Sequence, residues 1–233
     1  MDQQRLKELA GARAVEALVH SGMKLGLGTG STAIPAVRHI GALMAQGKLK
    51  DIRAVPTSFQ TTIECEKWGI PLFTLNSREI GGELDLTIDG ADEVDNENRC
   101  IKGGGGALLL EKIIAYASAS YAIVVDESKL VDHLGLKFPL PVEVVGEARV
   151  PVTRALEALG AEAALREAVR KAGPVITEHG NLIVDIRFKN PVDPAALEAE
   201  INHIAGVTEN GFFTRLRPRL FIAHRDGTVE ERA

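Results

Sequence analysis

The residues best suited to chemistry lie between Cys100 and Tyr116, in the stretch CIKGGGGALLLEKIIAY. Lys102 precedes four consecutive glycines, Gly103–Gly106, and an apolar run that carries one acid, Glu111, follows at once. Because glycine lacks a Cβ, its backbone can adopt positive φ and bring N–H groups close to an anion. A helix starting after the glycines would add the positive end of its dipole. The stretch therefore predicts a cradle for a negatively charged ligand.

Glu111 is the acid placed for proton transfer in this stretch. Helical spacing puts it on the same face as Gly104 and Ala107, away from the apolar stripes through Ile113 and Ile114, which we expect to be buried. Helical side chains lean toward the N-terminus, so its carboxylate should lie over the glycine turn. A carboxylate beside backbone donors and an ammonium group can remove a proton next to a carbonyl. The alternative is an ordinary glycine loop followed by a solvated surface charge.

A second glycine-rich turn, GLGTGST at residues 26–32, joins a predicted strand to a predicted helix. This construction is usual for a phosphate site in an α/β sheet. The dinucleotide fingerprint is incomplete because Ser31 occupies its third glycine position, and no Gly-Lys pair is followed by Ser or Thr as in a nucleotide P-loop. The amides and the hydroxyls of Thr29, Ser31 and Thr32 are expected to hold one phosphate group. A simple N-cap role for Ser31 or Thr32 is the alternative.

Two acids, Asp89 and Asp92, follow a short apolar strand predicted at 84–88 and flank a turn formed by Gly90 and Ala91. Open parallel sheets bind ligands at the carboxyl ends of their strands, so this position favours a role in the site. The acidic run continues to residue 97, and a calcium loop is one alternative, although the ligand spacing of such loops is missing. A solvated turn is the other alternative.

Lys129 supplies a further cation at the end of a strand predicted at 121–125, with a plain surface lysine as the alternative. All of these motifs fall at strand ends, so we expect them to meet in one cleft. None of the six histidines lies within them, and no serine elbow, cysteine pair or metal-binding set occurs. The reaction class that remains is carboxylate-driven proton transfer on a small phosphorylated carbonyl compound.

Composition describes an ordinary globular protein. The 233 residues, 45% of them hydrophobic, are enough for a substantial core. The net charge of -5 gives no general attraction to nucleic acid or acidic membranes, so an anionic ligand needs local groups. The apolar runs are shorter than the roughly 20 residues of a spanning helix and the N-terminus lacks signal-peptide features, which predicts a cytoplasmic location. Cys65 and Cys100 are expected to be buried thiols, not disulfide or zinc ligands.

Alternating strands and helices predict an α/β fold with a Rossmann-like, mostly parallel sheet. Later in the chain a βαββα pattern with alternating strands is typical of a smaller α+β domain, of the ferredoxin-like kind. We expect a catalytic domain at 1–131 plus 207–233 and the smaller domain at 132–206. The expected helices include 3–20, 33–43, 59–68, 148–159 and 194–204, and the expected strands include 24–27, 51–56, 72–75, 84–88, 121–125, 142–145, 182–188 and 220–223. No secondary-structure type is predicted for residues 163–172. Residues 206–207 and 220–223 are expected to form edge strands of the first domain.

In chain order, the segments GLGTGSTA, DGADE, IKGGGGALLLEKI, DESK and KFPLPVEV resemble motifs of the A-type ribose-5-phosphate isomerases, nearly from end to end. These motifs are long, and together they are highly specific. The resemblance implies that D-ribose 5-phosphate and D-ribulose 5-phosphate are interconverted through an enediolate in the pentose phosphate pathway, with no metal and no cofactor. It also implies a Rossmann-like domain, a smaller α/β domain and a homodimer or homotetramer.

The resemblance further implies a role for each motif residue. Glu111 would be the base that moves the proton between C2 and C1, while Asp89 and Asp92 would assist ring opening and move hydroxyl protons. Lys102 would steady the enediolate oxygens together with the amides of Gly103, Gly104 and Gly105. The remaining substrate contacts would come from Thr29, Gly30, Ser31, Thr32, Gly90, Ala91 and Lys129. Family members often place an N-terminal lysine near the phosphate, and Lys7 is the nearest match, one residue out of register.

Two other functions stay open from the sequence. A non-catalytic sugar-phosphate sensor, as in some transcription regulators, has a similar fold, but a basic helix-turn-helix segment is missing and Glu111 is present. Acyl transfer, as in coenzyme A transferases, uses a glutamate nucleophile on a similar fold, but the short sequence and the phosphate loop argue against it.

Overall fold

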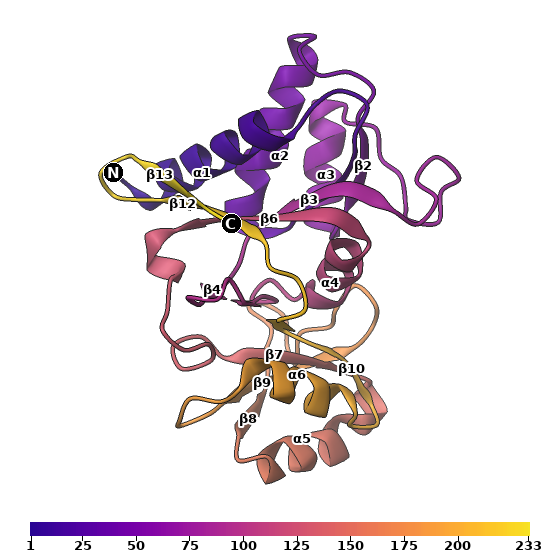
Figure 1. The fold of residues 1–233 in the computed structure, drawn as a ribbon. Coiled ribbons are helices and arrows are strands. Elements are labelled where there is room, and N and C mark those ends of the chain that lie inside the picture. The colour runs from indigo at the N-terminus through magenta and orange to yellow at the C-terminus, as the bar shows by residue number, and fades with distance from the viewer. The chain divides into compact units, whose positions relative to one another are not determined.

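The structure is a computed structural model that describes residues 1–233, and the chain forms two compact units (Figure 1). Unit 1 comprises Met1–Ala91, Leu110–Lys129 and Leu216–Ala233. Unit 2 comprises Asp92–Leu109 and Leu130–Arg215.

Unit 1 is built on a six-stranded sheet in the order β13-β12-β6-β3-β1-β2. The strands are β1 (Lys24–Leu27), β2 (Arg53–Pro56), β3 (Leu84–Asp89), β6 (Ser118–Asp126), β12 (Arg219–Ala223) and β13 (Val229–Arg232). Every pair is parallel except β12 with β13, which form an antiparallel hairpin. The carboxyl ends of β1, β3 and β6 therefore lie at one edge of the sheet.

The helices of unit 1 lie on both faces of this sheet. They are α1 (Gln3–Leu18), α2 (Gly30–Ala45), α3 (Phe59–Trp68) and α4 (Leu108–Tyr116), which belongs to unit 1 from Leu110 onward. The 3-10 turn η1 (Glu127–Lys129) follows β6. α1, α2 and α3 cover one face and α4 the other (Figure 1). Successive residues of β1 face opposite sides of the sheet, which explains this arrangement. Leu25 and Leu27 pack in the core with residues of α1 and α2. Gly26 faces the other side, where a Cβ would lie 2.5 Å from Ile114 of α4.

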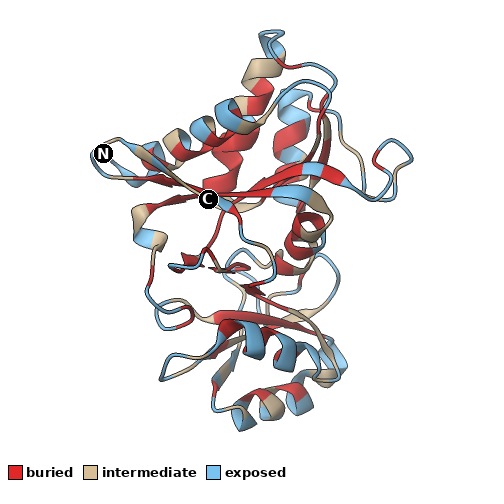
Figure 2. Cartoon of the chain, viewed as in Figure 1, coloured by how far each residue is buried: buried red, intermediate tan, exposed pale blue.

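Unit 2 contains two antiparallel sheets. The larger has the order β10-β7-β9-β8 and the smaller β11-β5-β4. Their strands are β4 (Glu93–Val94), β5 (Cys100–Ile101), β7 (Leu140–Val144), β8 (Glu162–Leu165), β9 (Leu182–Arg187), β10 (Val207–Asn210) and β11 (Phe212–Phe213). The helical elements are η2 (Gly146–Ala148), α5 (Arg149–Ala158) and α6 (Pro194–Asn202), and buried residues of both α-helices pack on the larger sheet (Figure 2).

The predicted fold class is confirmed: the chain is α/β, with a mainly parallel sheet and a small antiparallel one. Helix α3 has the predicted bounds because Ser58 caps it and Gly69, at φ 64, ends it in the left-handed conformation. The predicted strand at 72–75 is wrong. Only Leu72 makes a bridge, to Ala54, and the chain then turns at Thr74, whose N–H donates to Ser77 Oγ at 3.0 Å.

Two expectations about the C-terminal strands are also wrong. Residues 220–223 belong to β12, which is not an edge strand, because the unforeseen β13 pairs with its free side. Residues 207–210 form β10, which pairs with β7 in unit 2. The compact units accordingly depart from the expected domain boundaries at 92–109, 130–131 and 207–215, which belong to unit 2.

No helix combines the length and the apolar character needed to cross a bilayer. Both cysteines are buried free thiols, as predicted, and burial raises the pKa of the Cys65 thiol to about 12.

Candidate active site

The glycine turn after β1 is held by a cluster of hydroxyl groups. Thr29 Oγ1 lies 2.6 Å from Thr57 Oγ1 and 2.6 Å from Ser58 Oγ, and Thr61 Oγ1 donates to the Gly28 carbonyl at 2.7 Å. The Thr29 hydroxyl is therefore engaged with the start of α3. Thr57 and Ser58 lie outside the motifs singled out in the sequence, and their link to residue 29 could not be read from spacing.

A cation reaches the same turn from α1. Lys7 Nζ donates to the hydroxyl of the exposed Ser31 at 2.8 Å, despite the shift in register noted above. Helix α2 begins at Gly30, so the first amides of the helix have no acceptor within it. Thr29, the N-cap residue, makes no side-chain capping bond to them. A lysine, a hydroxyl and a helix N-terminus at one place form an arrangement that suits a phosphate group.

Asp89, the last residue of β3, lies directly against this turn. Its side chain is fully buried, and its Oδ1 accepts the N–H groups of Thr29 at 3.1 Å and Gly90 at 2.7 Å. A Cβ on Gly28 would lie 2.1 Å from the same oxygen, which explains the glycine there. The parallel pairing of β1 with β3 thus brings two sequence-predicted motifs together.

Glu111 lies in the first turn of α4 and is only 4% exposed, so it is not a solvated surface charge. Leu110 and Ile114 anchor this part of α4 to Leu84 of β3. The expected burial of the stripe through Ile113 is wrong: Ile113 is 46% exposed. Successive helical residues are rotated by about 100°, so turning Ile114 to the sheet leaves its neighbour outside.

Lys129 ends η1, directly beyond β6, and its side chain is half-buried. The buried Asp126 fixes this turn by accepting the Ser128 N–H at 3.0 Å and the Gln3 side-chain amide at 3.3 Å. Burial alone would raise the pKa of Asp126. The two hydrogen bonds, a third from the Ser128 hydroxyl and the charge of Lys129 together outweigh burial and lower this pKa. The DESK motif is thereby held at the same sheet edge as Asp89.

In unit 2, Asp92 and the glycine run form a second cluster. Asp92 Oδ2 accepts the Gly104 N–H at 2.7 Å, so one amide of the expected anion cradle already has an acceptor. A Cβ on Gly104 would lie 2.5 Å from the other Asp92 oxygen. Gly103 and Gly106 adopt positive φ, as expected of a glycine loop, while Gly104 and Gly105 do not.

Lys102 is 2% exposed, and its ammonium lies 5.5 Å from the centroid of the Phe213 ring. Sequence reasoning missed Arg166, which donates to the carbonyls of Gly103 at 3.0 Å and Gly104 at 3.1 Å. Arg166 is itself paired with Asp185 at 2.7 Å. It lies in the segment whose type was left open, and no motif marks it.

The rest of the acidic run supports the fold of unit 2. Glu93 accepts the N–H groups of Gly135 and Phe138, each at 2.7 Å, and Asp95 accepts Arg99 Nε at 2.6 Å. Both acids are 2% exposed, so the solvated-turn alternative does not apply to them. No group of three or more His, Cys, Asp or Glu side chains is arranged to hold a metal ion.

Comparisons with known proteins decide the family. The family described as "Ribose 5-phosphate isomerase A (phosphoriboisomerase A)" matches residues 53–227. The chain belongs to the ribose 5-phosphate isomerase A family. A relative of that name from Treponema denticola is 54% identical over 99% of this chain and 100% of its own, and one from Treponema pallidum is 53% identical over 100% and 94%.

Solved structures of this isomerase family agree in fold. Ribose 5-phosphate isomerase A from Methanocaldococcus jannaschii is 43% identical, with a TM-score of 0.91 over 97% of both chains. A D-ribose-5-phosphate isomerase solved in complex with phospho-erythronic acid is 38% identical, with a TM-score of 0.94 over the full length of both chains. The family resemblance read from the motifs is therefore confirmed, and the chain is an isomerase.

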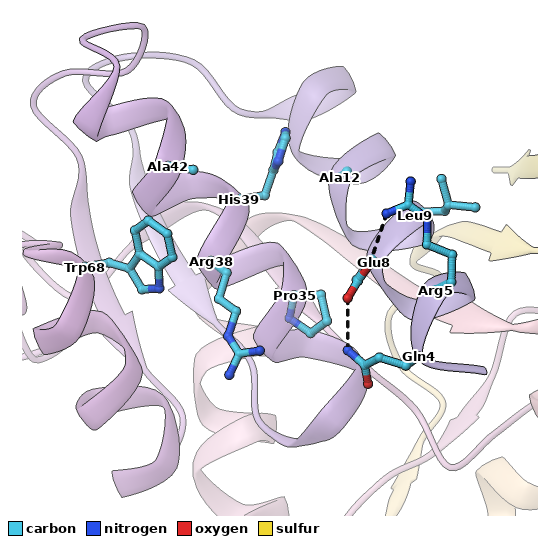
Figure 3. A pocket seen from close by; sticks show the side chains of 10 residues that line it. All are labelled: Gln4, Arg5, Glu8, Leu9, Ala12, Pro35, Arg38, His39, Ala42 and Trp68. Atoms are coloured by element: carbon cyan, nitrogen blue, oxygen red, sulfur yellow. Dashed lines mark hydrogen bonds and ion pairs between the residues drawn. The ribbon is translucent and has the colours of Figure 1, made fainter. Parts of the chain in front are cut away.

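A separate hollow of about 450 Å³ lies between α1, α2 and the end of α3 (Figure 3). None of the motif residues that the isomerase family suggested lines it. Its arginines are paired: Arg5 with Glu8 at 3.1 Å, and Arg38 with Glu64 at 2.7 Å. The hydrogen bond between Arg38 and Glu64 raises the pKa of the guanidinium and lowers that of the carboxyl. This hollow is therefore not lined by the glycine turn after β1, residues 26–32.

Proposed function

We propose that this chain interconverts D-ribose 5-phosphate and D-ribulose 5-phosphate, with Glu111 as the base. One observation supports the site above all: the buried carboxylate of Asp89 bonds to the turn that presents Ser31 and the α2 N-terminus, and Lys7 of α1 reaches the same turn. An acid group next to an anion site is what a phosphorylated sugar requires.

The phosphate group is held away from the reacting carbons by the amides and hydroxyls of residues 29–32, with Lys7 and Lys129 as the cations. Binding energy from this remote group orients C1 and C2 before the chemistry begins. Lys129 is assigned this role from the DESK motif and from its place beyond β6.

The reaction begins from a closed sugar ring, which hides the carbonyl. Asp89 and Asp92 assist ring opening and proton movement between hydroxyl groups. Glu111 then takes the proton from C2, giving an enediolate, and returns it to C1, so that C1 is reduced and C2 oxidised with no external electron carrier. Lys102 and the glycine amides stabilise the negative oxygens. The contact between Asp92 and Gly104 leaves Gly103 and Gly105 as the amide donors.

The family resemblance also extends to assembly and location. We propose a homodimer or homotetramer in the cytoplasm that takes its sugar phosphate from solution and needs neither nucleic acid nor membrane. Light scattering on the purified chain measures the oligomer size directly, and a monomeric mass at working concentration contradicts this part of the proposal.

Glu111→Gln tests the assigned base. Glutamine keeps the shape of the side chain but cannot accept the proton, so the variant should fold and lose about 10²- to 10⁴-fold in turnover. A coupled assay with ribose 5-phosphate measures the rate, and Glu66→Gln, an exposed acid on α3, is the matched control. Near wild-type turnover in the Glu111 variant removes Glu111 as the base.

A further inference from the structure

Gln60, in the first turn of α3, makes a hydrogen bond that its position does not require. The residue is exposed, yet its Oε1 accepts the N–H of Gly30 at 2.9 Å. Ordering a long exposed side chain costs conformational entropy, which the hydrogen bond to Gly30 must offset. Its partner is the first residue of α2, with φ of +90°.

This bond is one of several that join the start of α3 to the start of α2. Ser58, the N-cap of α3, bonds to Thr29, the N-cap of α2, at 2.6 Å, and Thr61 bonds to the Gly28 carbonyl at 2.7 Å. The positive ends of two helix dipoles therefore lie together at this turn. The ammonium of Lys7 on Ser31 adds to the positive potential.

Within this turn the helix amides differ in what they can offer a ligand. The Gly30 N–H is occupied by Gln60, whereas the amides of Ser31 and Thr32 follow it in the first turn of α2 and have no acceptor within the helix. A Cβ at position 30 would have no atom within 4 Å, so steric crowding does not require glycine there. The positive φ of the backbone does. Glycine reaches this conformation without strain but is also free to leave it, so a hydrogen bond to its N–H helps to select it.

We propose that Gln60 is a positioning residue of the phosphate site. By accepting the Gly30 N–H it holds the left-handed start of α2, so that the amides of Ser31 and Thr32 face a phosphate dianion together with the Ser31 hydroxyl and Lys7. The inference rests on the proposed function for the identity of the ligand, a sugar phosphate. It assigns a role to a residue outside every motif that pointed to the family.

The side chain at position 60 must meet two conditions. It must place a hydrogen-bond acceptor as far from the backbone as glutamine Oε1. Methionine is of similar length but has no oxygen to accept the N–H. It must also be neutral, because a glutamate accepts the same N–H but places a negative charge beside the phosphate. Gln60→Met and Gln60→Glu therefore separate geometry from charge.

The experiment measures the dissociation constant of inorganic phosphate by calorimetry, and KM and kcat for ribose 5-phosphate, in the full chain. Gln60→Met and Gln60→Ala should weaken phosphate binding and raise KM by about fivefold, the worth of one ordinary hydrogen bond, while kcat changes little. Gln60→Glu should weaken phosphate binding roughly tenfold, and this deficit should shrink as salt is raised. Gln46→Met, an exposed glutamine at the opposite end of α2, should match the wild type.

Three results overturn the proposal. Unchanged phosphate affinity in Gln60→Met and Gln60→Ala, with or without a lower melting temperature, makes the contact structural only. Tighter phosphate binding in Gln60→Ala makes Gln60 a competitor of the ligand. A salt-independent loss in Gln60→Glu removes the argument from charge, and this variant keeps the test decisive if Gln60→Met fails to fold. If the wild type does not convert ribose 5-phosphate, the proposed function fails, while the phosphate affinities still report on Gln60.

Discussion

At the scale of one residue, Asp89 is a buried carboxylate that holds a loop and that we propose also serves the chemistry. One oxygen is fixed by the amides of Thr29 and Gly90, which orients the whole group at the end of β3. Since sugar phosphates exist largely as closed rings, the proposed mechanism needs a separate acid-base group before Glu111, the proposed base, can act. Rigid placement on a strand end is the form of preorganisation that this step requires.

Asp89→Asn tests the ring-opening role. Asparagine keeps an oxygen for the two amides but cannot exchange a proton, so only the open-chain aldose remains a substrate. With ribose 5-phosphate, the initial rate should level off as enzyme concentration is raised, because spontaneous ring opening becomes limiting. With ribulose 5-phosphate, which is open-chain, the rate should stay proportional to enzyme. Proportional rates with both sugars argue against a ring-opening role for Asp89.

Gly28→Ala tests how tightly the proposed phosphate turn, residues 26–32, is packed on Asp89. The new methyl carbon would lie 2.1 Å from Asp89 Oδ1, so the turn or the carboxylate must move. We expect a loss of about 1–3 kcal/mol in the free energy of unfolding, measured by urea titration. Gly146→Ala is the control, since no atom lies within 4 Å of its Cβ and its φ is not positive, and its stability should stay within about 1 kcal/mol of wild type. Equal stabilities of the two variants contradict the packing argument.

At the scale of elements, the β12–β13 hairpin is tied to the turn that carries Lys129. His224, at the start of the hairpin loop, bonds to Glu127 of η1 at 3.0 Å and to Glu230 of β13 at 3.2 Å. The hydrogen bond to Glu127 is the main cause that raises the pKa of His224, against the effect of partial burial, and Glu230 acts in the same direction.

This raised pKa predicts a pH dependence of stability. The imidazolium is favoured in the folded state, so its contribution is complete below the unfolded pKa of about 6.5 and is lost as pH rises through the higher folded value. We expect wild type to exceed His224→Gln in free energy of unfolding by up to about 1 kcal/mol at acidic pH, with the difference vanishing at alkaline pH. Urea titrations of both proteins across this range measure it. A difference that is constant with pH means that the charge of His224 is not involved.

The sequence predicted elements well where local signals mark both ends. β1 and α3 have the predicted bounds because an apolar run or a capping pair delimits them. The position of β12 within the sheet could not be predicted, because its outer partner β13 reads VEER and has no apolar alternation. Strand pairing depends on the partner, and the partner was not recognisable from its own residues.

The same distinction applies to the candidate site. Residues within glycine-rich and acidic motifs, such as Asp89 and Glu111, could be proposed as site residues from the sequence because their types and neighbours already indicate chemistry. Gln60 and Arg166 could not be proposed in this way, since each is linked to the candidate site only by hydrogen bonds to a segment distant in sequence: Gly30 for the first and the glycine run of unit 2 for the second. No local pattern marks a side chain whose importance comes from such a contact.

For the whole molecule, a ligand that binds only the folded state must raise its stability. At a ribose 5-phosphate concentration of 100 times the dissociation constant the gain is about 2.7 kcal/mol, which in a chain of this size shifts the melting temperature upward by roughly 5–10 °C. We propose that the turn at residues 29–32 supplies the anchoring contacts, so unphosphorylated ribose at the same concentration should give almost no shift. Differential scanning calorimetry with each sugar measures both, and the Gly28→Ala variant should show a smaller shift with ribose 5-phosphate, since its turn is displaced. Equal shifts from ribose and its phosphate would mean that the protein recognises the sugar without the anion, which contradicts the assignment of residues 29–32.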